Sequence, residues 1–458
     1  MIGVMSIGQL HRQLSRFFTT VMTADSGPFS KVCTDSRAIK AGDFFVALRG
    51  PNFNAHEYLH QVQEMGAVGA MVDTIDPTCS LAQLQVDDTV LGLGELARAN
   101  RSRFNSPVVA ITGSSGKTTV RTMVDGILRE HGEVLTTQGN LNNHIGVPLT
   151  LLRLTGQERY AVIEMGASAI GEIAYLCELA VPDVALVNNV MPAHLEGFGS
   201  LEGVADAKGE IYQGVKADGC CVVNLDDQFS GQWLAQLKDR TLLSFSLKNT
   251  AAHCYASNIE VTDTGLQFEI QLLGRTLPIC LSVGGYHNVR NALAATCCAY
   301  AVGASDEAIV CGLSKFSSVN GRMKFCRGPN GSTIIDDSYN ANPGSVRAAI
   351  DVLADIKGAN ILVMGEMGEL GEESHLHHAE IGAYASGKAL QAVFTIGPMA
   401  RAVSENFSGP SKHFENQKDL LEHLLSVVTD SDCTVLIKGS RSARMDLVAG
   451  ALIDEDEL

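Results

Sequence analysis

The residues best suited to chemistry lie at positions 112–119, which read TGSSGKTT. This segment follows the apolar run of residues 108–111, typical of a strand, and precedes apolar residues that recur at helical spacing. Glycines let a backbone wrap around a phosphate, and the amides at a helix N-terminus point at it. Lys117 can reach the β- and γ-phosphates of a nucleotide, and Thr118 can ligate Mg²⁺. Because strand, loop and helix follow in the required order, we predict a nucleotide-binding loop rather than an ordinary Gly/Ser turn.

Two side chains at predicted strand ends could complete a metal site beside this loop. Glu164 ends the apolar run of residues 161–163, and His194 lies in the Gly- and Pro-containing loop after residues 184–190. Mg²⁺ takes oxygen ligands from a protein in addition to those of phosphates. Taken singly, each residue could be a solvated strand-end carboxylate or a loop imidazole, and the neighbouring phosphate loop favours the metal site.

Lys208 lies in residues 201–215, whose apolar residues mark one face of a predicted helix. It follows Val204 by four positions and precedes Ile211 by three, which places it on or beside that face. A buried lysine is rare unless it is paired. Two interpretations remain open: the ammonium extends past the helix to solvent, or the lysine is held in a site as a cation or in chemically modified form.

Composition limits what kind of protein carries these residues. The chain has 458 residues, enough for about three domains. Its net charge of −17 argues against binding to a nucleic-acid polymer, which normally meets a basic face. No stretch reaches 18 consecutive apolar residues, so we expect no insertion into a membrane. Twelve scattered cysteines without a C-x-x-C pair indicate free thiols in a reducing cytoplasm.

Short apolar runs alternate with helical patterns along most of the chain, which predicts an α/β fold with mostly parallel sheets. The runs are residues 43–48 and 67–72 in a first block, residues 108–111, 161–163, 184–187 and 220–223 in a second, and residues 334–335, 361–364, 393–396 and 435–437 in a third. In such sheets, ligands bind beyond the carboxyl ends of the strands.

Six segments together resemble the Mur ligases. They are residues 112–119, residues 139–148 (GNLNNHIGVP), residues 194–199 (HLEGFG), residues 285–291 (GYHNVRN), residues 336–343 (DDSYNANP) and residues 438–442 (KGSRS). The resemblance extends from about residue 34 to residue 446. The DDSYNANP and KGSRS segments are typical of one branch of the family.

The resemblance implies three domains with separate tasks. Residues 1–83 form a small α/β domain that holds the UDP end of a sugar nucleotide, residues 84–313 bind ATP on a P-loop-type, mostly parallel sheet, and residues 314–458 form a Rossmann-like open sheet. The branch joins D-alanyl-D-alanine to the terminal carboxylate of UDP-N-acetylmuramoyl-tripeptide through an acyl phosphate. We therefore expect a cytoplasmic monomer that uses ATP and Mg²⁺ in peptidoglycan precursor synthesis.

The resemblance also implies a role for individual residues. The expected ATP contacts are Gly113, Ser114, Ser115, Gly116, Lys117, Thr118, Thr119, Asn288, Asn291 (both to adenine), Arg322 (to the γ-phosphate) and Asp337 (to the ribose). The expected substrate contacts are Thr34, Asp35, Ser36, Arg37, Asn140, Asn142 and Asn143. The expected metal ligands are Thr118, Glu164, His194 and a carbamylated Lys208. Lys117, His194, Lys208 and Arg322 are the expected catalytic residues, and Arg322 requires the third domain to close onto the second.

Three alternative functions fit the phosphate loop less well. Another ligase of the same superfamily, such as a folylpolyglutamate synthase, does not account for the DDSYNANP and TDSR segments. A regulatory GTPase needs an N-K-x-D motif, and residues 224–227 (NLDD) lack its lysine. A non-catalytic nucleotide-binding scaffold has no need of an intact site made of Lys117, Thr118, Glu164 and His194.

Overall fold

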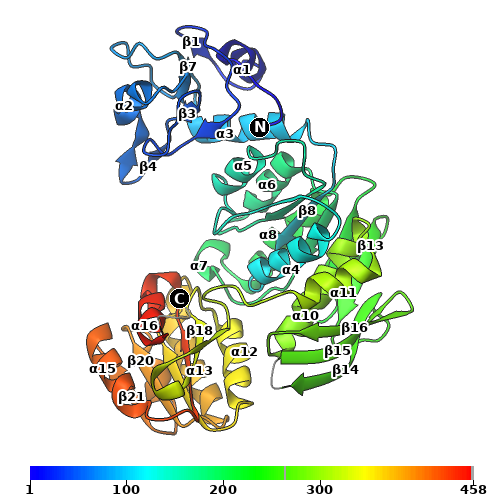
Figure 1. Cartoon of the computed structure of the whole chain (residues 1–458), viewed down its shortest axis with the longest axis vertical. Coiled ribbons are helices and arrows are strands. Elements are labelled where there is room, and N and C mark those ends of the chain that lie inside the picture. Colours follow the sequence, from blue (N-terminus) through cyan, green and yellow to red (C-terminus); the bar gives the residue numbers. More distant parts are fainter. Residues whose placement is uncertain (263–264, 455–458) are drawn as a thin grey trace.

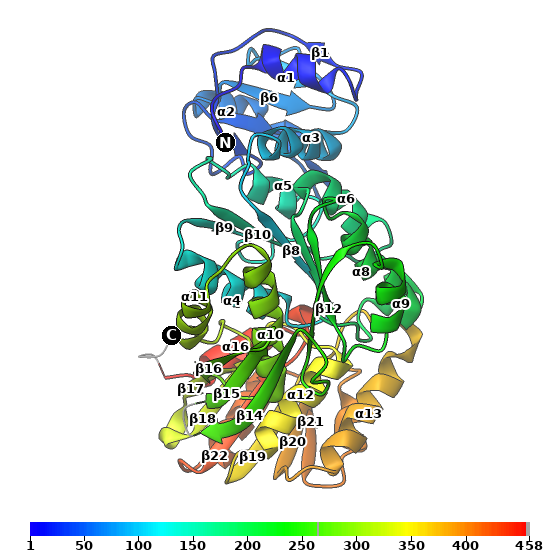
Figure 2. The same ribbon diagram turned by 90° about the vertical axis from the view of Figure 1, so that its right-hand side faces the viewer.

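Three sheets, each flanked by helices, follow one another along the chain in a computed structural model that describes residues 1–262 and 265–454. The N-terminal, central and C-terminal units lie in a row, with the central unit between the other two (Figures 1 and 2). The predicted α/β class with mostly parallel sheets is confirmed. The predicted domain boundaries at residues 83 and 313 stay predictions.

The N-terminal sheet has the order β1-β7-β6-β3-β2. Its strands are β1 (Val21–Met22), β2 (Val32–Cys33), β3 (Phe44–Val46), β6 (Gly69–Val72) and β7 (Gln83–Gln85). A hairpin, β4 (Arg49–Gly50) and β5 (Phe53–Asn54), stands apart from it. Helix α1 (Ile7–Leu14) begins with a reciprocal Ser6–Gln9 capping box. The predicted helix at residues 56–65 is a 3₁₀ turn, Ala55–Tyr58, followed by α2 (Leu59–Glu64).

The central sheet has nine strands in the order β16-β15-β14-β13-β12-β11-β8-β10-β9. They are β8 (Val108–Thr112), β9 (Val134–Thr136), β10 (Tyr160–Glu164), β11 (Val184–Val187), β12 (Cys220–Asn224), β13 (Thr241–Ser246), β14 (Cys254–Thr262), β15 (Gly265–Leu272) and β16 (Arg275–Leu281). The four predicted central runs are β8, β10, β11 and β12, and they pair in parallel.

Strands β14 to β16 form an antiparallel extension that the sequence analysis missed. Buried and more exposed side chains alternate along β15 and β16, as expected where one face of a sheet is covered. That alternation in GLQFEIQL was the available signal for a strand of this kind.

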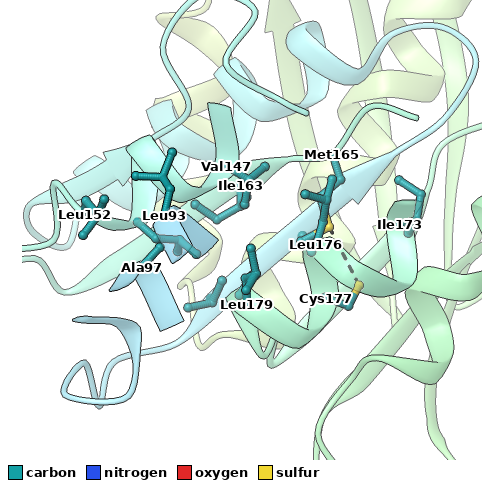
Figure 3. Packing of buried hydrophobic residues seen from close by; sticks show 14 of the residues in the cluster. Leu93, Ala97, Val147, Leu152, Ile163, Met165, Ile173, Leu176, Cys177 and Leu179 are labelled. Atoms are coloured by element: carbon teal, nitrogen blue, oxygen red, sulfur yellow. Dashed lines mark hydrogen bonds between the residues drawn. The ribbon is translucent and has the colours of Figure 1, made fainter. Parts of the chain in front are cut away.

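Helices cover both faces of the central sheet. They are α3 (Thr89–Arg101), α4 (Lys117–Arg129), α5 (Gly146–Leu151), α6 (Glu172–Ala180), α7 (Leu195–Phe198), α8 (Leu201–Gln213), α9 (Ser230–Gln236), α10 (Tyr286–Ala301) and α11 (Asp306–Ser314). One apolar core joins α4, α10 and α11 to the sheet. A second core lies on the other face, where Leu93 and Ala97 of α3 and Leu176 of α6 cluster with Ile163 of β10 (Figure 3).

The C-terminal sheet has the order β17-β18-β22-β19-β20-β21 and is parallel except at β17. Its strands are β17 (Lys324–Arg327), β18 (Thr333–Asp337), β19 (Ala359–Met364), β20 (Ala392–Ile396), β21 (Ser411–Phe414) and β22 (Cys433–Lys438). Its helices are α12 (Pro343–Ala354), α13 (Ser374–Ser386), α14 (Arg401–Glu405), α15 (Gln417–Val427) and α16 (Met445–Leu452). None of the helices in the described part of the chain is long and apolar enough to cross a membrane.

Asn100, at the end of α3, ties the N-terminal segment to the central unit. Its side chain is fully buried, accepts a hydrogen bond from the Ile2 amide at 2.7 Å, and donates to the carbonyls of Leu151 and Leu154 at 2.9 and 3.1 Å. Three backbone groups from distant parts of the chain thus depend on one amide.

Replacing Asn100 with alanine should therefore lower stability by about 1–3 kcal/mol, because buried backbone groups lose their partners. Urea denaturation monitored by circular dichroism measures the change. Ser102→Ala is the matched control, since its exposed hydroxyl bonds to only one carbonyl at the end of the same helix. Equal denaturation midpoints for Asn100→Ala and the unmodified protein would contradict this account.

Candidate active site

A cavity of about 510 Å³ lies where the carboxyl ends of the central strands face the C-terminal unit. It brings together all predicted ATP and metal residues except Gly113, together with the predicted substrate residues of one loop. The central unit contributes Ser114, Ser115, Gly116, Lys117, Thr118, Thr119, Asn140, Asn142, Asn143, Glu164, His194, Lys208, Asn288 and Asn291. The C-terminal unit contributes Arg322, Asp337, Tyr339, Asn342, Lys438 and Arg441, among others.

The predicted phosphate loop connects β8 directly to α4. Gly116 precedes the helix with φ +76°, a left-handed conformation that glycine adopts without strain. Lys117 is the first residue of α4, and its ammonium donates to the Gly113 carbonyl at 2.8 Å, across the mouth of the loop. Burial lowers the pKa of Lys117, and Glu164 opposes this shift. The loop therefore holds a desolvated cation where phosphates are expected.

Asn189, just beyond β11, braces this loop. The Ser114 amide donates to the Asn189 backbone carbonyl, and the Ser115 amide donates to the Asn189 side chain, both at 2.9 Å. These two amides are engaged within the protein. The N–H groups in the first turn of α4 lack partners inside the helix and point along its axis towards the cavity. They are the better candidates for phosphate contacts.

Glu164, at the end of β10, joins three segments of the central unit. Its carboxylate accepts hydrogen bonds from Thr118 Oγ1 at 2.9 Å and from Asn142 Nδ2 at 2.8 Å, and lies 3.5 Å from Arg121 Nη1. Arg121 is buried and was missed by the sequence analysis, although it follows Lys117 by four positions on the same face of α4. A carboxylate and a hydroxyl thus lie side by side at the base of the loop.

Lys208 of α8 is 2% exposed, so the alternative in which its ammonium reaches solvent is wrong. The nitrogen lies 5.6 Å from the centre of the Phe198 ring. Burial, and to a lesser extent the charge of Lys117, lowers the pKa of Lys208 to about 7. Burial therefore favours the neutral amine of Lys208 over its ammonium form.

His194 and Glu369 face one another across the two units, each in a left-handed backbone conformation (φ 54° and 61°). His194 precedes α7, which lies beside the C-terminal unit in Figure 1. Its Nδ1 contacts the Glu369 carboxylate, which comes from the loop after β19. Burial lowers the pKa of His194, while Glu369 opposes that shift. Sequence reasoning missed Glu369, because nothing near it in the chain points to position 194.

Asp337 and Lys438 form a buried ion pair at the ends of β18 and β22, where they are register partners. The Lys438 ammonium donates to Asp337 Oδ2 at 2.5 Å and to the Asn340 carbonyl at 3.0 Å. Burial raises the pKa of Asp337, and Lys438 opposes this effect. Nearby, the Arg322 guanidinium lies 4.2 Å from the centre of the Tyr339 ring. The pair holds the DDSYNANP segment in place at the cavity.

The predicted substrate residues Thr34, Asp35, Ser36 and Arg37 follow β2 in the N-terminal unit and do not line this cavity. Asp35 accepts hydrogen bonds from the Arg37 side chain at 2.9 Å, which lowers the pKa of Asp35 to about 2. Arg37 is largely exposed. Residues 34–37 could bind only a part of a ligand that is long enough to extend from the N-terminal unit towards the cavity.

Comparisons with known proteins agree with this arrangement. Residues 111–299 match the Mur ligase middle domain, and residues 321–441 match the Mur ligase, glutamate ligase domain. The UDP-N-acetylmuramoyl-tripeptide–D-alanyl-D-alanine ligase of Escherichia coli (strain K12) is 43% identical, over 92% of this chain and 93% of its own.

Solved structures show the same fold. MurF from Acinetobacter baumannii superposes with a TM-score of 0.92 at 34% identity, over 98% of this chain and 99% of its own. MurF ligase from Thermotoga maritima, solved in complex with ADP, has a TM-score of 0.82 at 28% identity, over 91% and 96% of the two chains.

Removing one partner of the buried Asp337–Lys438 pair should be costly. We expect Lys438→Met to lower stability by about 3–5 kcal/mol, because an uncompensated carboxylate stays buried at neutral pH. Thermal denaturation as a function of pH tests this: the deficit should shrink as pH falls and Asp337 takes up a proton. Arg441→Ala is the control, since its ion pair with Asp446 is exposed and worth little. A loss no larger than that of Arg441→Ala would contradict the argument.

Proposed function

We propose that this chain, which belongs to the Mur ligase family, is an ATP-dependent ligase that joins D-alanyl-D-alanine to the terminal carboxylate of UDP-N-acetylmuramoyl-tripeptide. The observation that carries the proposal is the single cavity in which the phosphate loop of one unit faces Arg322 and the Asp337–Lys438 pair of another. A relative of that name from Escherichia coli matches nearly the whole chain at 43% identity. The product is a precursor of peptidoglycan.

The reaction must overcome the low reactivity of a carboxylate. The γ-phosphoryl group of ATP passes to the terminal carboxylate of the tripeptide, which gives an acyl phosphate and ADP. The neutral amine of D-alanyl-D-alanine then attacks the acyl carbon, and the tetrahedral intermediate expels phosphate and leaves an amide. Lys117 and Arg322 offset the repulsion between the two anions in the first step. The attacking amine must lose a proton, which a base or a water chain accepts.

ATP binding in this proposal uses the groups that meet in the cavity. The backbone amides in the first turn of α4 and the Lys117 ammonium hold the β- and γ-phosphates. To reach the phosphates, the Lys117 ammonium gives up its hydrogen bond to the Gly113 carbonyl. Asn288 and Asn291 serve adenine, and Asp337 serves the ribose. The solved structure of a relative with ADP supports a nucleotide as ligand.

The donor set at the base of the loop suits Mg²⁺. Thr118 Oγ1 and Glu164 Oε2 are hard oxygen donors 2.9 Å apart. Among residues 1–262 and 265–454, no group of three or more His, Cys, Asp or Glu side chains is arranged to hold a metal ion by itself. Mg²⁺ commonly takes one or two protein oxygens and completes its shell with phosphates and water. When bound, it would neutralise phosphate charge.

We further propose that Lys208 is carbamylated and, with His194, serves a second Mg²⁺. The neutral amine attacks CO₂, forms an N–C bond and releases a proton, so that a buried neutral amine becomes an anion with two oxygen donors. The low pKa of Lys208, about 7, supplies the neutral amine. The unmodified ammonium would repel Mg²⁺, so the fit of this position depends on the modification.

The remaining assignments concern the substrate and the setting of the enzyme. Residues 34–37 would contact the uridine diphosphate, and Asn140, Asn142 and Asn143 would contact the sugar–peptide part near the cavity. Closure of the C-terminal unit, in which Asn342 donates to the Ser114 carbonyl at 3.4 Å, would keep water from the acyl phosphate. Twelve free cysteines, ten of them buried, support a cytoplasmic location, and a site built from one chain supports a monomer.

One assay tests the proposed function against its alternatives. Phosphate release from ATP is measured without a second substrate, with UDP-N-acetylmuramoyl-tripeptide alone, with D-alanyl-D-alanine alone, with both, and with a folate and glutamate. The proposed ligase requires both. Release with neither substrate would indicate a simple nucleotide hydrolase, and release only with a folate and glutamate would indicate the related folylpolyglutamate activity.

Lys208→Ala tests the carbamate directly. We expect this variant to lose almost all ligation, and millimolar short carboxylic acids to restore part of it by supplying the missing oxygens. Incubation of the unmodified protein with ¹³C-labelled CO₂ should add one carbamate resonance, which Lys208→Ala lacks. Full activity of Lys208→Ala, or the same spectrum for both proteins, would leave Lys208 as an unmodified buried cation.

A further inference from the structure

Asn188, the first residue after β11, is fully buried beneath the phosphate loop. Its amide nitrogen donates two hydrogen bonds, to the Ser115 carbonyl at 3.0 Å and to Asn291 Oδ1 at 3.1 Å. Asn291 Nδ2 donates to Asn288 Oδ1 at 3.3 Å, and Asn288 Nδ2 donates to the Gly284 carbonyl at 2.7 Å. Three asparagine amides thus form one chain of hydrogen bonds from the phosphate loop to the start of α10.

The direction of this chain is set at both of its ends. An asparagine amide can be turned over, so its orientation follows from its partners. The Ser115 carbonyl accepts only, which forces Asn188 to present nitrogen there. The Gly284 carbonyl likewise forces Asn288 to present nitrogen. Turning over any of the three amides would bring two oxygens, or two nitrogens, face to face in the buried chain.

Two observations show how Asn188 is placed relative to the phosphate loop. Its Oδ1 is buried and has no hydrogen-bond partner in the described part of the chain. In addition, a Cβ on Gly116 would lie 2.6 Å from Asn188 Nδ2 and 2.7 Å from Asn291 Oδ1, so the loop glycine is fitted to the chain below it.

This chain of hydrogen bonds fixes the orientation of the Asn288 amide, and Asn288 lines the cavity. With Nδ2 donating to the Gly284 carbonyl and Oδ1 accepting from Asn291, its amide keeps one N–H and one lone pair that no other described residue uses. A donor beside an acceptor matches the N6 amino group and N7 of adenine. Guanine presents O6 and N7, both acceptors, and would set O6 against Asn288 Oδ1.

We propose that Asn188 is a positioning residue that sets the choice of nucleotide base, by fixing the orientation of Asn288 through Asn291. It touches no ligand itself. The inference rests on the proposed function in one respect, that the nucleotide base lies against Asn288. Because Asn188 also holds the Ser115 carbonyl, it links the phosphate loop to the residues that select the base.

The test compares ATP with GTP as substrates of the full-length protein, together with the muramoyl tripeptide and D-alanyl-D-alanine. For Asn188→Ala we expect the ratio of kcat/KM for ATP to kcat/KM for GTP to fall by about tenfold or more, mainly through a higher KM for ATP. The KM for D-alanyl-D-alanine should stay unchanged. A ratio taken on one preparation is independent of how much of the variant is folded.

Asn188→Asp is the isosteric second variant. Its carboxylate cannot donate to Ser115 or Asn291, so Asn291 must turn its nitrogen towards position 188 and its oxygen towards Asn288. We expect the same loss of selectivity, although aspartate fills the volume of asparagine and leaves no empty space in the core. Asn100→Ala is the control, since it removes an equally buried asparagine far from the cavity and should keep the ATP preference of the unmodified protein.

An unchanged ATP-to-GTP ratio in both Asn188 variants would overturn the inference and leave Asn188 as a structural residue. Absence of ligation in the unmodified protein would instead overturn the proposed function. In that case the preference for ADP over GDP, measured by calorimetry on the same variants, decides the role of Asn188. A preference that the substitutions weaken supports it, and one that they leave unchanged refutes it.

Discussion

The carboxyl ends of two sheets face each other across one cavity, and several of the proposed reactive groups lie at these strand ends. β8, β10 and β11 end at the phosphate loop, at Glu164 and at Asn188, while β18 and β22 end at Asp337 and Lys438. Parallel strands expose their chain ends at the same edge, so groups far apart in sequence collect there. A site made this way is complete only when the two units meet, as at His194 and Glu369.

Three lysines line the cavity of a chain whose net charge is −17, and Lys208 and Lys438 are buried while Lys117 is partly buried. Each of the three has a different surrounding. Lys117 spans the phosphate loop, Lys208 lies against the Phe198 ring, and Lys438 is paired with Asp337. Burial lowers the pKa of both Lys117 and Lys208. The Lys438 ammonium donates a hydrogen bond to the Asp337 carboxylate. The same residue type can thus act as a phosphate contact, a modifiable amine and a structural cation.

Prediction from sequence succeeded where the chain repeats a local pattern. The strand, loop and helix around residues 108–129 form as expected, and so does the amphipathic helix that buries Lys208. The antiparallel strands β14 to β16 were missed, because their period-two alternation departs from the βα alternation of the segments on either side. Arg121, Glu369 and the Asn188 chain were missed for a different reason, because their partners lie far away in sequence or at unremarkable positions.

The sequence by itself determined the α/β class, the phosphate loop and the types of residue available to the site. These follow from hydrophobic periodicity, glycine placement and strand-to-helix order, all of which act over a few residues. Only the tertiary structure decided which of these residues meet, that Lys208 is sealed from solvent, that the Ser114 and Ser115 amides are engaged, and that three asparagines share one direction of hydrogen bonding. Burial and hydrogen-bond polarity belong to the assembled neighbourhood, so no short stretch of the chain contains them.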